Sequence, residues 1–112
     1  MDKVIKEWLA TLKGAYKALD ADEIEAFLRQ SKKSSNEFIK RQGEKLILYT
    51  RQLAEGSITV KQYESYVEDV RILTEMHALQ LKGRARDAAH SFSKRAAEYL
   101  IKQIVAAVMK AI

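Results

Sequence analysis

The chain has 112 residues, a length that suits one domain and not two. Hydrophobic residues make up 47% of the chain, which is normal for a globular protein and too high for a disordered one. Lysine and arginine outnumber aspartate and glutamate by 20 to 15, and the absence of cysteine excludes a disulfide scaffold, thiolate zinc sites and cysteine nucleophiles.

The N-terminal region predicts two helices, over residues 3–19 and 21–31. Apolar residues recur at spacings of three and four in both segments, as they do on one face of an amphipathic helix. Asp2 is placed to cap the first helix, because its side chain can accept hydrogen bonds from the free amides of the first turn. Asp20 and Glu23 have the spacing of a capping box, which predicts the start of the second helix.

A third helix is predicted over residues 35–55. Ser34 and Glu37 have the spacing of a capping box at its start. Gly56 follows its expected end, where glycine adopts the left-handed backbone conformation at little cost.

The strongest start signal belongs to the fourth helix. Thr59 and Gln62 form a capping box, and Ile58 and Tyr63 are spaced for a hydrophobic staple, so a tight helix–helix corner is expected. Residues 53–64 also resemble the short helical motif found at the ends of many bacterial proteins and associated with oligomerisation. Here the motif lies in mid-chain, and no function is carried over from it.

The last half of the chain predicts helices over residues 60–82 and 84–112, interrupted only by Gly83. We expect a long helix that is bent or broken near Gly83 in some states and continuous in others. The whole chain, residues 1–112, is therefore expected to form a single all-α domain. Its predicted architecture is a bundle of four to five helices, built from helical hairpins, with a long C-terminal helix.

The fourth helix carries apolar residues on two opposite faces. Its main face, drawn at ~100° per residue, holds an aromatic and aliphatic set: Tyr63, Tyr66, Val67, Val70, Leu73, His77 and Leu81. Ile72, Met76 and Leu79 fall on the opposite face. One apolar face suffices for packing on a single core, so the second face needs another partner.

The C-terminal helix also has a wide apolar arc. Leu100 and Ile104 lie on one side, and a second aliphatic row lies beside them, formed by Ile101, Val105, Val108 and Ile112. This row and the second face of the fourth helix are the predicted self-association residues, most simply in a symmetric dimer. The alternative is a monomeric bundle in which the chain folds back at Gly83.

Residue patterns typical of enzymes and metal sites are not found. Asp87 and His90 could share a metal ion, but a di-iron site needs Glu-x-x-His pairs that the chain lacks, so an ordinary surface pair is expected. His77 is interpreted as a hydrogen-bonded core or interface histidine. A glycine-rich phosphate loop and a nucleophile elbow are also missing, so we expect no cofactor and no enzymatic activity.

Positive charge is concentrated near the C-terminus. Residues 61–80 carry two basic and four acidic side chains, whereas residues 81–112 carry seven basic and two acidic ones. The candidate anion-binding residues are Lys82, Arg84, Arg86, Lys94 and Arg95. They support an alternative function, sequence-blind nucleic-acid binding. A further alternative is a peripheral membrane protein that uses residues 94–112 as a cationic amphipathic helix.

The favoured interpretation is a non-enzymatic interaction or assembly module, bacterial or phage-like in its compactness. Its expected partner is a second copy of itself, or another helical protein bound by helix-in-groove contact. Charged residues interrupt the apolar positions near the N-terminus, and no window holds 18 consecutive apolar residues. We therefore expect no secretion signal and no membrane span, and a cytoplasmic location.

Overall fold

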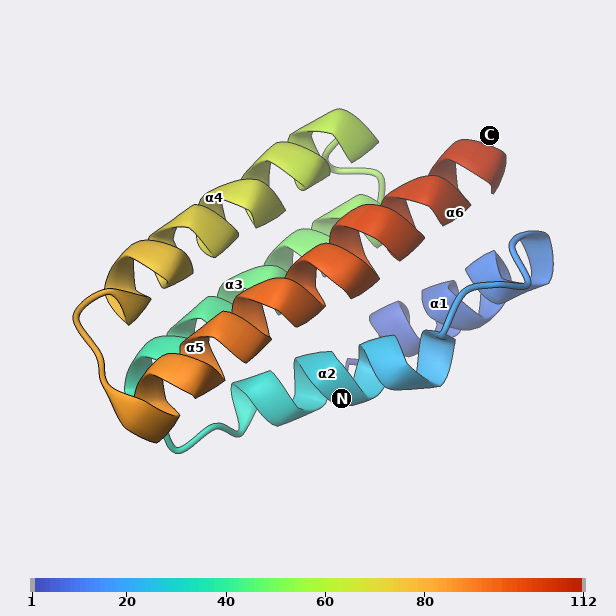
Figure 1. Cartoon of the computed structure of the whole chain (residues 1–112). Coiled ribbons are helices and arrows are strands. Elements are labelled where there is room, and N and C mark those ends of the chain that lie inside the picture. The colour runs from blue at the N-terminus through green and yellow to red at the C-terminus, as the bar shows by residue number, and fades with distance from the viewer. Residues whose placement is uncertain (1, 112) are drawn as a thin grey trace.

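The computed structural model describes residues 2–111 and confirms the all-α fold class. Its helices are α1 (Lys3–Ala15), α2 (Ala21–Lys32), α3 (Glu37–Ala54), α4 (Val60–Ala78), α5 (Gly83–Ala96), the π-helical segment η1 (Ala97–Ile104) and α6 (Val105–Ala111). The last three follow one another without a break and form a long C-terminal rod. This rod runs between α4 on one side and α1 and α2 on the other, with α3 behind it (Figure 1).

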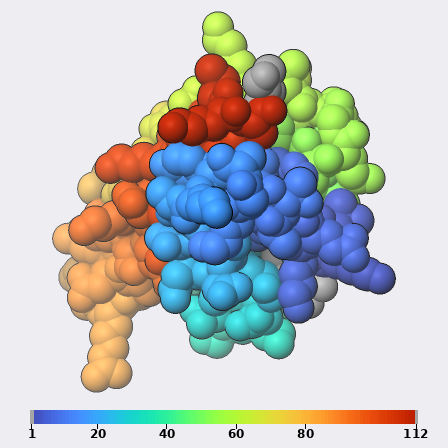
Figure 2. Space-filling model, turned by 90° about the vertical axis from the view of Figure 1, so that its right-hand side faces the viewer, coloured from blue at the N-terminus to red at the C-terminus, as the bar shows by residue number. Residues whose placement is uncertain are grey.

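The last helix of the rod packs against the N-terminal region of the chain. Helix α1 packs against α6, and the ammonium of Lys110 lies 5.7 Å from the centre of the Tyr16 ring. Figure 2 looks onto this end, where the blue atoms of the N-terminal region contact the red atoms of α6. The C-terminal rod is therefore held along its length, by α4 and α2 at its start and by α1 at its end.

Two predicted helix starts are confirmed. The Asp2 side chain accepts hydrogen bonds from the amides of Val4 and Ile5 at the start of α1. Thr59 and Gln62 form the complete reciprocal capping box at the start of α4.

The corner before α4 also follows its sequence signals. Gly56 has φ +75°, and its amide donates to the carbonyl of Leu53 while the next amide, of Ser57, donates to the carbonyl of Gln52. This is the hydrogen-bond pattern of a Schellman motif, which closes the end of α3.

The other two predicted capping boxes are wrong. The Asp20 side chain makes no capping bond at the start of α2 and accepts instead from Nε2 of the Gln103 side chain. The backbone amide of Asp20 donates to Oε1 of the same side chain. Helix α3 is capped by the Asn36 side chain, which accepts a hydrogen bond from the backbone amide of Ile39. The Ser34 hydroxyl accepts from the backbone amide of Asn36, before the helix begins. At α2 the Gln103 side chain takes up the groups of Asp20, and at α3 the cap lies two residues later than predicted.

The chain does not continue as one helix across Gly83. Helix α4 ends at Ala78, the chain turns over residues 79–82, and α5 begins at Gly83 with φ +59°. The Arg86 side chain donates to the carbonyls of Ala78 and Leu79, which satisfies two acceptors at the end of α4. The turn sends the C-terminal rod back along α4.

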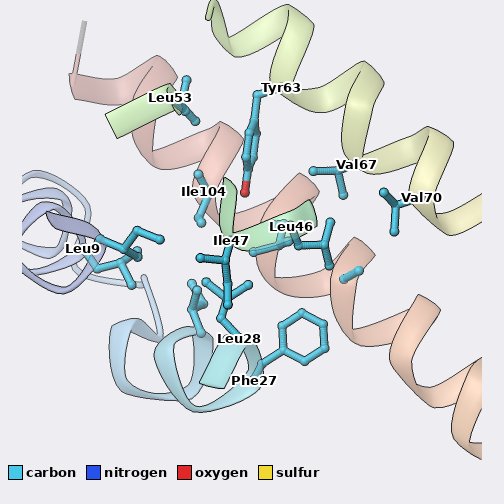
Figure 3. Close-up of a cluster of buried hydrophobic side chains, with 14 of the residues drawn as sticks. Leu9, Phe27, Leu28, Leu46, Ile47, Leu53, Tyr63, Val67, Val70 and Ile104 are labelled. Carbon is cyan, nitrogen blue, oxygen red and sulfur yellow. The ribbon is translucent and has the colours of Figure 1, made fainter. Parts of the chain in front are cut away.

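The core lies where α3, α4 and the C-terminal rod meet, with α1 and α2 closing the other side. Tyr63 is fully buried and its hydroxyl points to the centre of the bundle (Figure 3), 2.9 Å from the Thr50 hydroxyl. Thr50 donates its own proton to the carbonyl of Leu46, so Tyr63 is the donor of this buried bond. Burial raises the pKa of the Tyr63 phenol well above its ordinary value.

Helices α2 and α3 approach closely at Gly43. A Cβ atom at this position would lie 2.7 Å from the Cβ of Ser31 and 2.9 Å from its carbonyl carbon. A Cβ atom at Gly14, by contrast, would have no heavy atom within 4 Å other than those of its own stretch of helix backbone. Gly43 is therefore required by packing, although a glycine inside a helix is intrinsically unfavourable.

We predict opposite effects for alanine at these two glycines. Gly43→Ala should lower the free energy of unfolding by about 1–3 kcal/mol, because α2 must move away. Gly14→Ala should raise it by about 0.5–1 kcal/mol, through the better helix propensity of alanine. Urea unfolding followed by circular dichroism measures both changes in the free energy of unfolding. Equal changes in the two variants would contradict the close approach of α2 and α3 at Gly43.

We also predict that Tyr63→Phe changes the alkaline stability profile. The substitution should cost about 0.5–1.5 kcal/mol near neutral pH through loss of the hydrogen bond. In the natural chain, the unfolded phenol ionises near pH ~10 while the buried one stays neutral, so the free energy of unfolding falls as the pH rises above ~10. The variant lacks this pH-dependent loss. The free energies of unfolding of the two proteins should therefore become more similar as the pH rises from neutral to alkaline. Parallel profiles would contradict the burial of this phenol.

Candidate functional site

The candidate site is an exposed apolar strip on α4 and its C-cap. Seven large hydrophobic side chains are exposed in the described part of the chain, and four of them lie within residues 72–79. Ile72, Met76 and Leu79 are 52%, 59% and 74% exposed, and we call these three residues the α4 stripe. They were predicted to lie on the face of α4 opposite the core, and the structure places them there.

The opposite face of α4 is covered by the rest of the molecule. Its buried side chains are Tyr63, Val67, Val70, Thr74 and Ala78. Thr74, which the hydrophobic pattern did not single out, is accommodated in this apolar row because its hydroxyl donates to the carbonyl of Val70. The row faces α3 and the C-terminal rod, which leaves the α4 stripe without a neighbour in the described chain.

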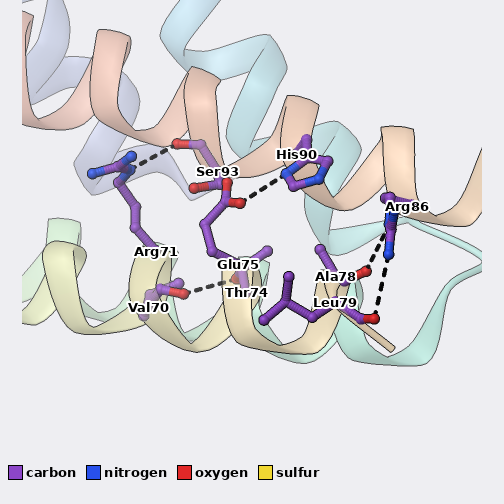
Figure 4. Close-up of polar contacts among 9 residues, drawn as sticks. All are labelled: Val70, Arg71, Thr74, Glu75, Ala78, Leu79, Arg86, His90 and Ser93. Atoms are coloured by element: carbon purple, nitrogen blue, oxygen red, sulfur yellow. Dashed lines mark hydrogen bonds and ion pairs between the residues drawn. The ribbon is translucent and has the colours of Figure 1, made fainter. Parts of the chain in front are cut away.

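A shallow groove of about 280 Å³ runs beside the α4 stripe, and Glu68, Arg71 and Glu75 form its polar wall. The Arg71 guanidinium donates to both carboxylate oxygens of Glu68 at 2.9 and 3.0 Å and to the carbonyl of Ser93 at 3.1 Å. Carboxylate oxygen Oε2 of Glu75 lies 2.7 Å from Nδ1 of His90 on α5 (Figure 4). These contacts hold the wall in place before any partner binds.

The groove continues toward the start of α4 as an acidic surface. A second hollow of about 440 Å³ shares Glu68 with the first and is lined by Lys61, Glu64, Ser65, Glu68, Asp69 and Ile101. Beyond the other end of the α4 stripe, Lys82 and Arg84 are exposed. The surface along α4 is therefore acidic at one end, apolar in the middle and basic at the other end.

The C-terminal aliphatic residues are placed differently from the α4 stripe. Ile101, Val105 and Val108 are half-buried and pack against the core. Ile112 lies outside the described residues. The apolar arc of the C-terminal rod is thus largely used inside the molecule, since Leu100 and Ile104 are fully buried.

The five candidate anion-binding residues have different surroundings. Arg86 caps the end of α4, and Arg95 is half-buried with its guanidinium over the Phe27 ring. Lys82, Arg84 and Lys94 are exposed.

The two histidines have local roles. His77 stacks on Phe38 with ring centres 3.9 Å apart, which ties α4 to α3. His90 contacts Glu75 of α4 and not Asp87 of its own helix. Among residues 2–111, no cluster of three or more histidine or carboxylate side chains is placed to bind a metal ion.

None of the helices that the structure describes combines the length and the apolar character needed to cross a bilayer. Comparison of the chain with protein-family models, curated proteins and solved structures gave no significant match.

Proposed function

We propose that the protein is a non-enzymatic assembly module that forms a homodimer through the α4 stripe. The observation that carries the proposal is the clustering of Ile72, Met76 and Leu79, all more than half exposed, on one face of a helix whose other face is buried. Burying a large apolar side chain contributes about 1.5–3 kcal/mol, so three adjacent ones favour an occupant strongly.

The charges along α4 indicate that the occupant is a second copy in antiparallel orientation. Asp69 lies on α4 before the α4 stripe, and Lys82 lies in the turn that follows it. An antiparallel partner thus places its basic end over the acidic end of the first chain. A parallel partner would set like charges against each other, which is unfavourable.

The area that a stable dimer must bury also indicates that the contact extends beyond the α4 stripe. Specific dimers bury about 800 Å² on each partner, more than three side chains provide. The adjoining hollow that carries Glu64, Asp69 and Ile101 extends the contact along α4. In a twofold dimer this acidic surface is used twice, each time by the basic end of the other copy.

The first test replaces the apolar contacts. The double variant Ile72→Asp, Leu79→Asp should weaken dimerisation by about 10⁴-fold or more, because it removes two buried side chains from each copy. Both residues are exposed in the single chain, so its fold should be unaffected. Sedimentation equilibrium at micromolar concentration measures the mass of each variant.

The matched control is Leu48→Asp, which changes an apolar residue of α3 that is 44% exposed and lies away from the α4 stripe. It should dimerise like the natural chain. A natural chain that stays monomeric at high micromolar concentration would refute the proposal.

The second test exchanges charges. Glu64→Lys with Asp69→Lys makes both ends basic, and Lys82→Glu with Arg84→Glu makes both ends acidic. Each double variant alone should dimerise about tenfold or more weakly, because like charges then face each other. An equal mixture should form a heterodimer at least as stable as the natural dimer, measured by native mass spectrometry. Equal dimerisation of all three samples would show that the copies do not meet in this orientation.

A further inference from the structure

A second surface feature, separate from the α4 stripe, lies between α2, the loop that follows it and α5. It is a cavity of about 370 Å³, within the size range of small-molecule sites. Its floor is apolar and consists of Phe27, Ile39 and Phe92, each less than a tenth exposed. Phe27 and Phe92 lie with ring centres 5.6 Å apart, so the floor offers aromatic faces.

One cation lines the cavity. The guanidinium of Arg95 lies 5.2 Å from the centre of the Phe27 ring and 6.0 Å from that of Tyr99, which restricts its position. None of the ten lining residues is acidic, and no carboxylate in the described part of the chain lies within ion-pair distance of Arg95. The cavity thus presents a positive charge that the protein itself does not neutralise.

Hydroxyl groups stand at the rim. Ser34 accepts the amide of Asn36 at 3.1 Å, so its own proton is available for donation into the cavity. Ser91 lies one helical turn before Arg95 on the same face of α5, and it is exposed.

We propose that this cavity binds a small organic anion, with a carboxylate, sulfonate or phosphate group on a compact aromatic or aliphatic body. Arg95 and the serine hydroxyls bind the oxyanion through charge-assisted hydrogen bonds, and the phenylalanine rings take up the apolar body. The proposal does not depend on self-association, because none of the cavity residues belongs to α4.

The probe is 1-anilinonaphthalene-8-sulfonate, compared with N-phenyl-1-naphthylamine, which has the same rings without the sulfonate. Fluorescence titration of the full chain should give one saturable site per chain for the sulfonate. The neutral probe should bind about tenfold or more weakly, because it forms no bond to Arg95. Amide shifts in the nuclear magnetic resonance spectrum should fall at residues 31–35 and 91–95.

Two variants test the assigned groups. Arg95→Met retains an apolar side chain over Phe27 and should weaken binding of the sulfonate about tenfold or more. Lys94→Met, the matched control, removes a neighbouring exposed cation that does not line the cavity and should leave affinity within about twofold. Ser91→Phe places a large ring in the cavity from an exposed position and should abolish binding without disturbing the core.

Three outcomes would overturn the proposal. These are the lack of saturable sulfonate binding, shifts confined to residues 72–79, and unchanged affinity in both Arg95→Met and Ser91→Phe. Shifts at residues 72–79 would place the probe on the α4 stripe, whose role is tested separately by the mass of the protein in solution.

Discussion

The reversal of the chain between α4 and α5 is the constraint on which the rest of the structure depends. Gly83 adopts φ +59°, a conformation that other residues reach only with strain, and Arg86 satisfies two carbonyls at the end of α4. Together they direct the C-terminal rod back along α4. The rod can then fill the space between α4 and the N-terminal hairpin, and this defines a single core.

The same reversal decides which apolar residues remain outside. The returning rod and α3 cover the face of α4 that carries Tyr63, Val67 and Val70, and a helix covered on that face keeps its opposite face in solvent. No other segment of the described chain is free to reach Ile72, Met76 and Leu79. The exposure of the α4 stripe is thus a direct consequence of the topology.

Local signals in the sequence predicted local structure where no distant group competed. The capping box of Thr59 and Gln62 and the glycine at position 56 act within a few residues, and both are observed. The predicted box at Asp20 failed because Gln103, 83 residues away in the chain, binds the same groups.

Gly43, which weakens a helix by propensity, proved necessary because Ser31 of the neighbouring helix touches its backbone. Such effects depend on tertiary neighbours that periodicity does not reveal.

In the candidate site, too, some features could be predicted from the sequence and others could not. The two faces of α4 follow from helical periodicity, so the α4 stripe could be predicted, but the fate of the C-terminal aliphatic and basic residues could not. Ala96, Leu100 and Ile104 recur every four residues, a spacing that drifts by ~40° per step around an α-helix. The wider turns of η1 wind more slowly and keep these side chains on the core side.

The fold also assigns the arginines of one basic cluster to separate tasks, because Arg86 faces the end of α4 while Arg95 faces the aromatic rings beside α2. Clustering of charge in the sequence therefore does not establish a single binding surface, whereas Arg95 lies beside an apolar floor with no carboxylate of the described residues within ion-pair distance.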